Sequence, residues 1–192
     1  MSTALVRFAA ASRLLHWLMA AMILTMLFIG VGMVTSESPR YHLLLSVHKP
    51  LGIAILVLVI IRFINRLVNP PPPLPDTMPR WMRLAAKGSH VLLYVLMFIM
   101  PLVGWGMLSA APYPVVLYGP VHLPPILPQD AALYAWLRQL HTTLAYLFFA
   151  TVLAHLGAAL LHGLIRRDGV LESMASWGRQ GSHRPRAPEG EN

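Results

Sequence analysis

Histidine is the residue whose number and placement in this sequence point most directly to chemistry. The chain has nine histidines and no cysteine among its 192 residues. Without cysteine, disulfides, iron–sulfur clusters and thiolate zinc sites are excluded, so metal chemistry must rely on imidazole nitrogen. Six histidines lie within or at the ends of long apolar stretches, where a polar side chain is costly unless it has a partner: His16, His48, His141 and His155, with His90 and His162 similarly placed.

The spacing of two of these histidines predicts two sites at different depths. His141 and His155 lie fourteen residues apart. On a helix this separation leaves them about 40° apart in azimuth and about 21 Å apart along the axis. One helix can therefore serve two stacked sites, with partners supplied by other helices at matching depths. We expect His16 to face His155 at one end and His48 to face His141 at the other.

Paired imidazoles in an apolar surround are typical of the two axial positions of haem iron. Such a closed, six-coordinate site moves electrons rather than binding oxygen. Zinc fits less well because it usually takes four protein ligands, or three and a water. Each histidine alone would be explained by a hydrogen bond to a neighbouring helix, but four at paired depths favour haem. His90 lies at a depth where it competes with His155, so spacing alone leaves that pairing open.

The elements that must carry these histidines are membrane-spanning helices. The chain is 56% hydrophobic and only 11% charged, too little polar surface for a soluble globule. A span needs about 20 largely apolar residues, and four stretches qualify, at residues 14–34, 48–68, 87–109 and 141–165. We predict an all-α integral membrane protein with a four-helix transmembrane domain at residues 1–172 and a polar, disordered tail at 173–192.

The distribution of positive charge predicts the orientation of the bundle. Twelve Lys and Arg residues lie in or beside the N-terminus, the second connection and the C-terminal segment. Only three lie on the other side: Arg40, Lys49 and Arg138. The positive-inside rule then places both termini in the cytoplasm. Because the charges flank apolar runs and form no basic face with interleaved aromatics, the net charge of +8 indicates a lipid partner and no nucleic acid.

Several short sequence segments together resemble those of a known family. They are RLLHWLMA at 13–20, VHKPLGI at 47–53, PPPPLP at 70–75, GSHVLLYVLMFIMPLVG at 88–104 and a long match at 140–174. In order and spacing they resemble the bacterial cytochrome b561 family, which is related to the cytochrome b subunits of nickel–iron hydrogenases. The resemblance implies a multi-pass protein of the bacterial inner membrane with two b haems. It assigns the ligands to His16, His48, His141 and His155, and gives His90 a secondary role.

Members that look similar include a superoxide oxidase, which takes an electron from superoxide outside and reduces ubiquinone near the cytoplasm. The resemblance associates His162 with the quinone end. Because His162 follows His155 by seven residues, close to two helical turns, it faces the same way nearer the membrane surface. There it is placed to hydrogen-bond a quinone or supply a proton, although a histidine reaching to the interface would look the same.

Lys49 and Arg138 are expected at the outer site, beside His48 and His141. They would attract an anion or neutralise haem propionates equally well. We therefore expect a dihaem cytochrome that moves electrons between an outer partner and the quinone pool. The alternatives are a superoxide:ubiquinone oxidoreductase, and a membrane anchor that conducts electrons for a dehydrogenase or hydrogenase docked on the outer loops. A transporter is disfavoured because charged groups near the bilayer centre are missing.

Overall fold

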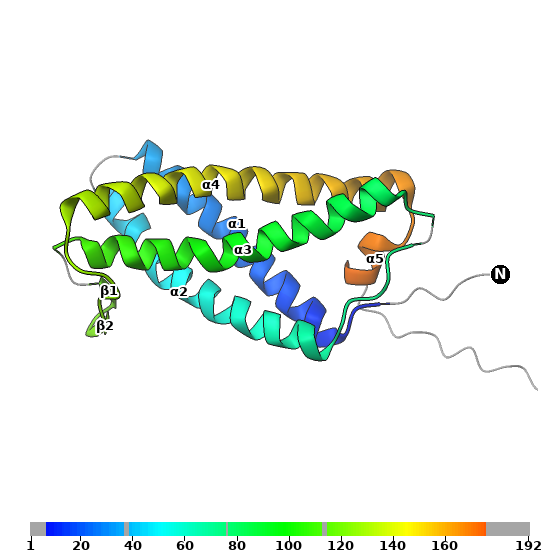
Figure 1. Ribbon diagram of the computed structural model, residues 1–192, viewed down its shortest axis with the longest axis horizontal. Helices are drawn as coiled ribbons and strands as arrows, with labels where there is room; N and C mark the ends of the chain where they lie inside the picture. The colour runs from blue at the N-terminus through cyan, green and yellow to red at the C-terminus, as the bar shows by residue number, and fades with distance from the viewer. Residues whose placement is uncertain (1–6, 37–38, 76, 113–114, 176–192) are drawn as a thin grey trace, which may run out of the picture.

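Four long helices form the body of the protein (Figure 1). The computed structural model describes residues 7–36, 39–75, 77–112 and 115–175. The long helices are α1 (Ala10–Thr35), α2 (Pro39–Val68), α3 (Arg80–Ala110) and α4 (Ala131–Leu160). Each is long and apolar enough to cross a membrane, counting α4 with the π-helical turn that follows it, so the prediction of a four-helix membrane bundle is confirmed.

All four helices begin earlier than the predicted spans, α1 by four residues. The prediction started the second span at residue 48 and treated 35–47 as a polar connection, but α2 already begins at Pro39 and contains His42. The third and fourth helices begin seven and ten residues before the predicted spans, at Arg80 and Ala131. Two of these starts, those of α2 and α4, have a local explanation in the first turn. Proline occupies the first position of α2, where its missing N–H is not needed, and the Asp130 side chain accepts a hydrogen bond from the Leu133 N–H at 2.7 Å.

Within the described residues, the connection between α3 and α4, at 111–130, departs from the all-α prediction. Strands β1 (Val115–Tyr118) and β2 (Val121–Leu123) pair as an antiparallel hairpin. The segment after the hairpin is tied to α3 by two hydrogen bonds. Trp105 Nε1 donates to the Pro124 carbonyl at 2.9 Å, and Ser109 Oγ accepts from the Ile126 N–H at 3.1 Å. The proline-rich connection is therefore an ordered cap on one end of the bundle.

The helices pack mainly as two hairpins, α1 against α2 and α3 against α4, with a lesser contact between α2 and α3. All four helices contribute to one buried apolar cluster, which we call the central plug: Met19, Ile23, Ile55, Val59, Leu96, Met97 and Phe148. Many other large apolar side chains remain exposed, Phe28 at 77% and Leu164 at 64% among them. Exposure of this kind is expected where lipid tails replace water around a bundle.

The described ends of the chain meet at the end of the bundle opposite the hairpin (Figure 1). After α4 the chain forms a π-helical turn, η1 (Leu161–Arg166), and then the short helix α5 (Val170–Ala175). The Phe8 N–H donates to the Ser173 carbonyl at 3.1 Å, and Trp17 Nε1 donates to the Met174 carbonyl at 3.2 Å. Helix α5 thus runs past residue 172, where we expected the membrane domain to stop, and residues 176–192 of the expected tail lie outside the described residues.

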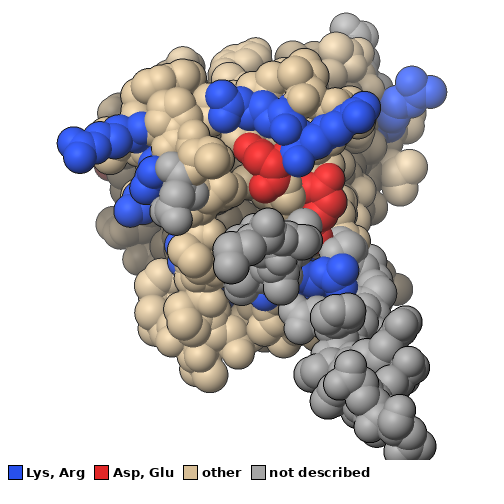
Figure 2. All heavy atoms as spheres, turned by 90° about the vertical axis from the view of Figure 1, so that its right-hand side faces the viewer, with Lys and Arg blue, Asp and Glu red and all other residues tan. Residues whose placement is uncertain are grey.

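Positive charge gathers at this end of the molecule. Figure 2, which faces the α5 end, shows Lys and Arg side chains around the rim and a smaller acidic patch between them. The described acidic residues that belong to the η1–α5 region are Asp168 and Glu172. The two ends of the bundle therefore differ in charge, as the count along the sequence predicted.

Gly163 allows α5 to pack against η1, and its replacement should loosen this end of the protein. A Cβ on Gly163 would overlap the Leu171 side chain, whose Cβ and Cγ lie only 3.2 and 3.3 Å from that position. We expect Gly163→Ala to lower the melting temperature and to expose the C-terminal segment to protease. Gly157→Ala is the matched control, because nothing lies within 4 Å of its Cβ position and alanine favours a helix by about 1 kcal/mol. Equal melting temperatures for Gly163→Ala and wild type would contradict the packing.

Candidate functional site

His48 and His141 face each other at the hairpin end of the bundle. His48 lies on α2 and His141 on α4, and their ring centroids are 6.2 Å apart with the planes at 66°. Both rings are partly buried, and Nδ1 of each is a buried atom with no hydrogen-bond partner among the described residues. The structure thus brings together the outer pair that the sequence predicted, in an environment where unpartnered ring nitrogens are costly.

Three histidines meet at the α5 end. His16 on α1 and His155 on α4 have ring centroids 6.3 Å apart, with the planes at 68°. His90 on α3 approaches His155 more closely, at 5.5 Å between centroids. His90 is also classed as exposed, whereas His16 and His155 are partly buried. The predicted inner pair is therefore present, with His90 beside it as the depth argument anticipated.

The ring separations distinguish between these partners. A metal–imidazole bond of about 2 Å, plus ~1.1 Å from nitrogen to ring centre, places two rings on opposite sides of one metal roughly 6.2 Å apart. His16–His155 and His48–His141 match this value, at 6.3 and 6.2 Å. His90–His155 is shorter, at 5.5 Å. Within the described part of the chain no three His, Asp or Glu side chains form a metal-binding cluster, which leaves paired imidazoles as the available ligand sets.

Each pair also spans a loosely packed boundary. His16 and His48 belong to the α1–α2 hairpin, whereas their partners both lie on α4, which packs mainly against α3. Gly104 on α3 lets the backbone lie beside the outer pair, since a Cβ there would be 3.3 Å from Cε1 of His141. A flat ligand between paired rings would therefore have to enter between the two helix hairpins, where backbone contact is sparse.

The central plug separates the two histidine levels. Phe148 lies midway along the relevant part of α4, seven residues from both His141 and His155. At 1.5 Å per residue this places Phe148 about 10 Å from each level. Tight apolar packing therefore occupies the middle of the bundle, while the histidines lie on either side of it.

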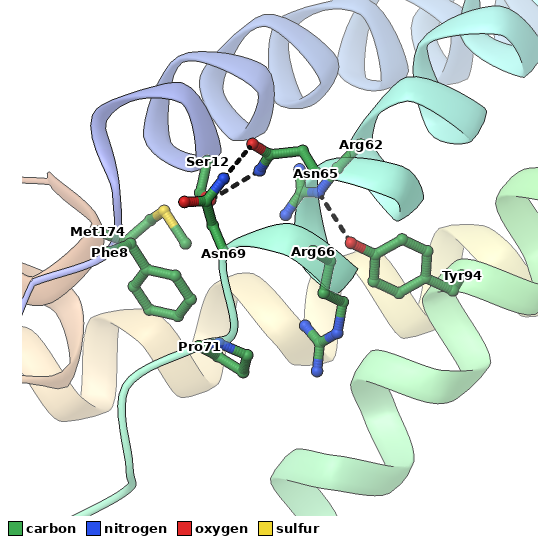
Figure 3. A pocket seen from close by; sticks show the side chains of 9 residues that line it. All are labelled: Phe8, Ser12, Arg62, Asn65, Arg66, Asn69, Pro71, Tyr94 and Met174. Atoms are coloured by element: carbon green, nitrogen blue, oxygen red, sulfur yellow. Dashed lines mark hydrogen bonds between the residues drawn. The ribbon is translucent and has the colours of Figure 1, made fainter.

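Two arginines lie beside the inner histidines. Nη2 of Arg62 is 2.9 Å from Nδ1 of His16, and Nε of Arg62 donates to the Tyr94 hydroxyl at 3.2 Å. The guanidinium of Arg66, one turn along α2, lies 5.6 Å from the centre of the same tyrosine ring. These side chains line a polar pocket with Asn65, Asn69 and Ser12, closed by Phe8, Pro71 and Met174 (Figure 3). Both arginines lie inside the predicted apolar span at 48–68, a position in which a charged side chain usually has a function beyond setting the orientation.

His162 forms an ion pair that the sequence did not reveal. Its Nδ1 lies 2.6 Å from Oδ2 of Asp168, and the two side chains are only 9% and 16% exposed. Residues six apart point to different faces of an α-helix. They meet here because η1 widens the turn, Arg167 adopts a left-handed conformation at φ 49°, and the chain then doubles back. A π-helical turn often occurs at a functional site, but it cannot be read from residue spacing.

Lys49 and Arg138 lie at the hairpin end, next in the chain to His48 and near His141. Lys49 is partly buried and Arg138 is exposed. Neither side chain forms an ion pair or a hydrogen bond within the described ranges. Both cations are therefore available to an anionic group at that end, as the sequence predicted, although the structure does not bring them into a defined pocket.

Comparison with known proteins gives the family of the chain. A family model described as "Prokaryotic cytochrome b561" matches residues 7–177. Cytochrome b561 homolog 2 of Escherichia coli K12 is 32% identical over 88% of this chain and 90% of its own. Cytochrome b561 homolog 1 of the same strain is 27% identical over 88% and 96%. A probable superoxide oxidase, CybB, of Yersinia pestis is 31% identical over 67% and 72%.

The family match covers the four membrane-spanning helices and all the histidines described above. The paired, partly buried imidazoles fit the b-type haem that this family implies. The chain belongs to the prokaryotic cytochrome b561 family, the multi-pass electron-transfer proteins of the bacterial inner membrane.

Proposed function

We propose that this protein is a dihaem cytochrome that moves electrons across the inner membrane to the quinone pool. His16 and His155 would hold one haem at the α5 end, and His48 and His141 the other at the hairpin end. The observation that carries this proposal is that two pairs of histidine rings have nearly the same separation, 6.3 and 6.2 Å between centroids. In each pair one of the two histidines lies on α4. One helix thus supplies a ligand to each site at depths about 21 Å apart.

Bound haem supplies reversible one-electron chemistry, and the chain sets the conditions for it. The two histidines of each pair would hold the haem iron between them, and a site closed in this way would favour electron transfer over oxygen binding. The central plug excludes water between the two levels and keeps the surround apolar. The histidines fix the depth of each site, and the helices fix the separation.

The proposed orientation places the α5 end in the cytoplasm. The cations at that end follow the positive-inside rule. The bonds from Phe8 and Trp17 to the α5 backbone support placing both chain ends on this side. The hairpin end then faces the periplasm, and His48 and His141 form the outer site.

We place the quinone reaction at the α5 end, with His162 as the proton donor. A quinone takes up two electrons and two protons to become a quinol, so an electron route must meet a proton source. Asp168 accepts from Nδ1 of His162 at 2.6 Å, which leaves Nε2 as the nitrogen that exchanges a proton with a ligand. Asp168 positions the imidazole by accepting this hydrogen bond. His162 recovers its proton from the cytoplasmic surface.

Superoxide is the outer electron donor that we propose as the second candidate. It is favoured by the similarity to the probable superoxide oxidase of Yersinia pestis and by the unpaired Lys49 and Arg138 at the hairpin end. Two superoxide anions would give up one electron each and leave as two oxygen molecules. The two electrons and two cytoplasmic protons would convert one quinone to one quinol.

The ligand assignment predicts two haems per chain in the wild type and one in selected variants. His141→Ala should remove the haem at the hairpin end, and His155→Ala the one at the α5 end, because each loses an axial ligand. A pyridine haemochrome assay on purified protein measures the content. His42→Ala, on the exposed first turns of α2, is the control and should keep both. If His155→Ala keeps two haems and His90→Ala loses one, the inner pair is His16 with His90. Folded wild-type protein that contains no haem would contradict the proposal as a whole.

The superoxide reaction should depend on salt because an anion must reach a weakly positive surface. Haem reduction by superoxide should slow as ionic strength rises, and Lys49→Gln with Arg138→Gln should remove most of that dependence. Stopped-flow absorbance of the oxidised protein mixed with a superoxide source measures the rate. Arg80→Gln, at the opposite end, is the charge-matched control. Haems that stay oxidised would rule out superoxide and make the β1–β2 cap the first surface on which to seek a protein donor.

The proton step predicts a separate effect at the α5 end. His162→Ala should slow the oxidation of reduced haem by ubiquinone about a hundredfold, the size expected for loss of a general acid. Asp168→Asn should slow it less, since an amide still orients the ring but carries no charge. Stopped-flow mixing of reduced protein with a soluble ubiquinone measures this rate. Glu172→Gln removes the same charge at the same end and should leave it unchanged. If both variants match wild type, the His162–Asp168 pair only fastens α5.

A further inference from the structure

The contact between Arg62 and His16 conflicts with metal binding by that ring. A guanidinium only donates hydrogen bonds and stays protonated in proteins. Nδ1 of His16, 2.9 Å from Nη2 of Arg62, must therefore accept, which leaves the proton of a neutral imidazole on Nε2. A protonated nitrogen cannot bind iron. For His16 to bind through Nε2 as a neutral ring, the proton must lie on Nδ1 and Arg62 must withdraw.

The surroundings of Arg62 indicate where it would go. Arg62 and Arg66 are both partly buried, and neither forms an ion pair within the described ranges. Their guanidiniums lie 5.9 and 5.6 Å from the centre of the Tyr94 ring. Two cations of like sign in a largely apolar region are costly without an opposite charge. The pocket around them therefore lacks an anion.

The pocket is built to receive a carboxylate. Its polar lining comprises Ser12, Arg62, Asn65, Arg66, Asn69 and Tyr94, with no acidic side chain among them (Figure 3). Arginine binds carboxylates with paired, charge-assisted hydrogen bonds. The pocket also touches the inner site directly, because Arg62 bonds both Tyr94 and His16. A ligand of the His16–His155 pair that carries carboxylates would place them within reach.

We propose that the Arg62–Arg66 pocket is the propionate site of the inner haem, and that Arg62 leaves His16 for a propionate when the haem binds. The same side chain then releases the ligand nitrogen and neutralises the incoming carboxylate. This inference rests on the proposed dihaem function. A free carboxylate or phosphate has the same chemistry, so the experiment must separate it from the haem's own propionate.

The test removes each partner of the proposed contact in turn. Full-length wild type and Arg62→Gln are synthesised in the presence of lipid nanodiscs and of either haem b or its dimethyl ester, which lacks the carboxylates. Transfer of haem to apomyoglobin measures release from each site. In wild type, we expect the ester to leave the inner site about tenfold faster than haem b, the loss expected for one charge-assisted contact. Arg62→Gln should release haem b equally fast, with no further effect of the ester.

Arg80→Gln removes an exposed charge at the same end of the protein and should behave as wild type. If the ester and Arg62→Gln each raise the rate of haem release and their effects multiply when combined, Arg62 does not contact a propionate and the proposal is overturned. If added acetate or phosphate slows the release of the ester from wild type but not from Arg62→Gln, the pocket binds a free anion instead. A structure of the haem-loaded protein with Arg62 still on Nδ1 of His16 would also overturn it. Wild type without an inner haem would instead refute the dihaem proposal itself.

Discussion

An imidazole inside a membrane needs a partner, and this requirement explains more of the structure than any other. Four histidines lie in two facing pairs, at 6.3 and 6.2 Å between ring centroids, and within the described residues no hydrogen bond joins the two rings of either pair, so a ligand held between the rings would be their partner. Because water is absent from the bilayer core, each unpaired ring would carry a penalty of several kcal/mol for its lost hydrogen bonds. The pairs can form only where α4 faces the α1–α2 hairpin, so the crossing of these helices follows from the same requirement.

Packing is divided between the middle of the bundle and its two ends. The middle is filled by the central plug, and the ends carry the polar side chains. At the hairpin end Nδ1 of His48 and of His141 has no hydrogen-bond partner among the described residues, whereas at the α5 end His16 is bonded to Arg62 and His162 to Asp168. This asymmetry supports different tasks for the two ends: exchange of an electron alone at one, and of an electron with a proton at the other.

Features that follow from regular helical periodicity could be predicted from the sequence. Features that depend on irregular backbone or on contacts between distant residues could not. The fourteen-residue separation of His141 and His155 predicted two levels of facing histidines, and the structure brings the rings of each predicted pair together, because an α-helix keeps its geometry over that length. Asp168 was missed since a π-helical turn and a left-handed Arg167 bring it to His162. The start of α2 at Pro39 was missed because its first turns are polar. The contact of Arg62 with His16 joins residues 46 positions apart, beyond the reach of any local pattern.

The sparse contact between the two helix hairpins has a consequence for biogenesis. Each hairpin makes its own close packing, so α1–α2 and α3–α4 can enter the bilayer and form as separate units, joined by the prolines at 70–73. Without haem, the two helix hairpins would contact each other mainly at the central plug. Haem bound between the paired histidines would then join the hairpins at both ends. If haem binds between the hairpins as proposed, maturation of the native bundle would depend on haem supply, and a haem-free chain would expose the boundary between its two hairpins to the cell's proteases.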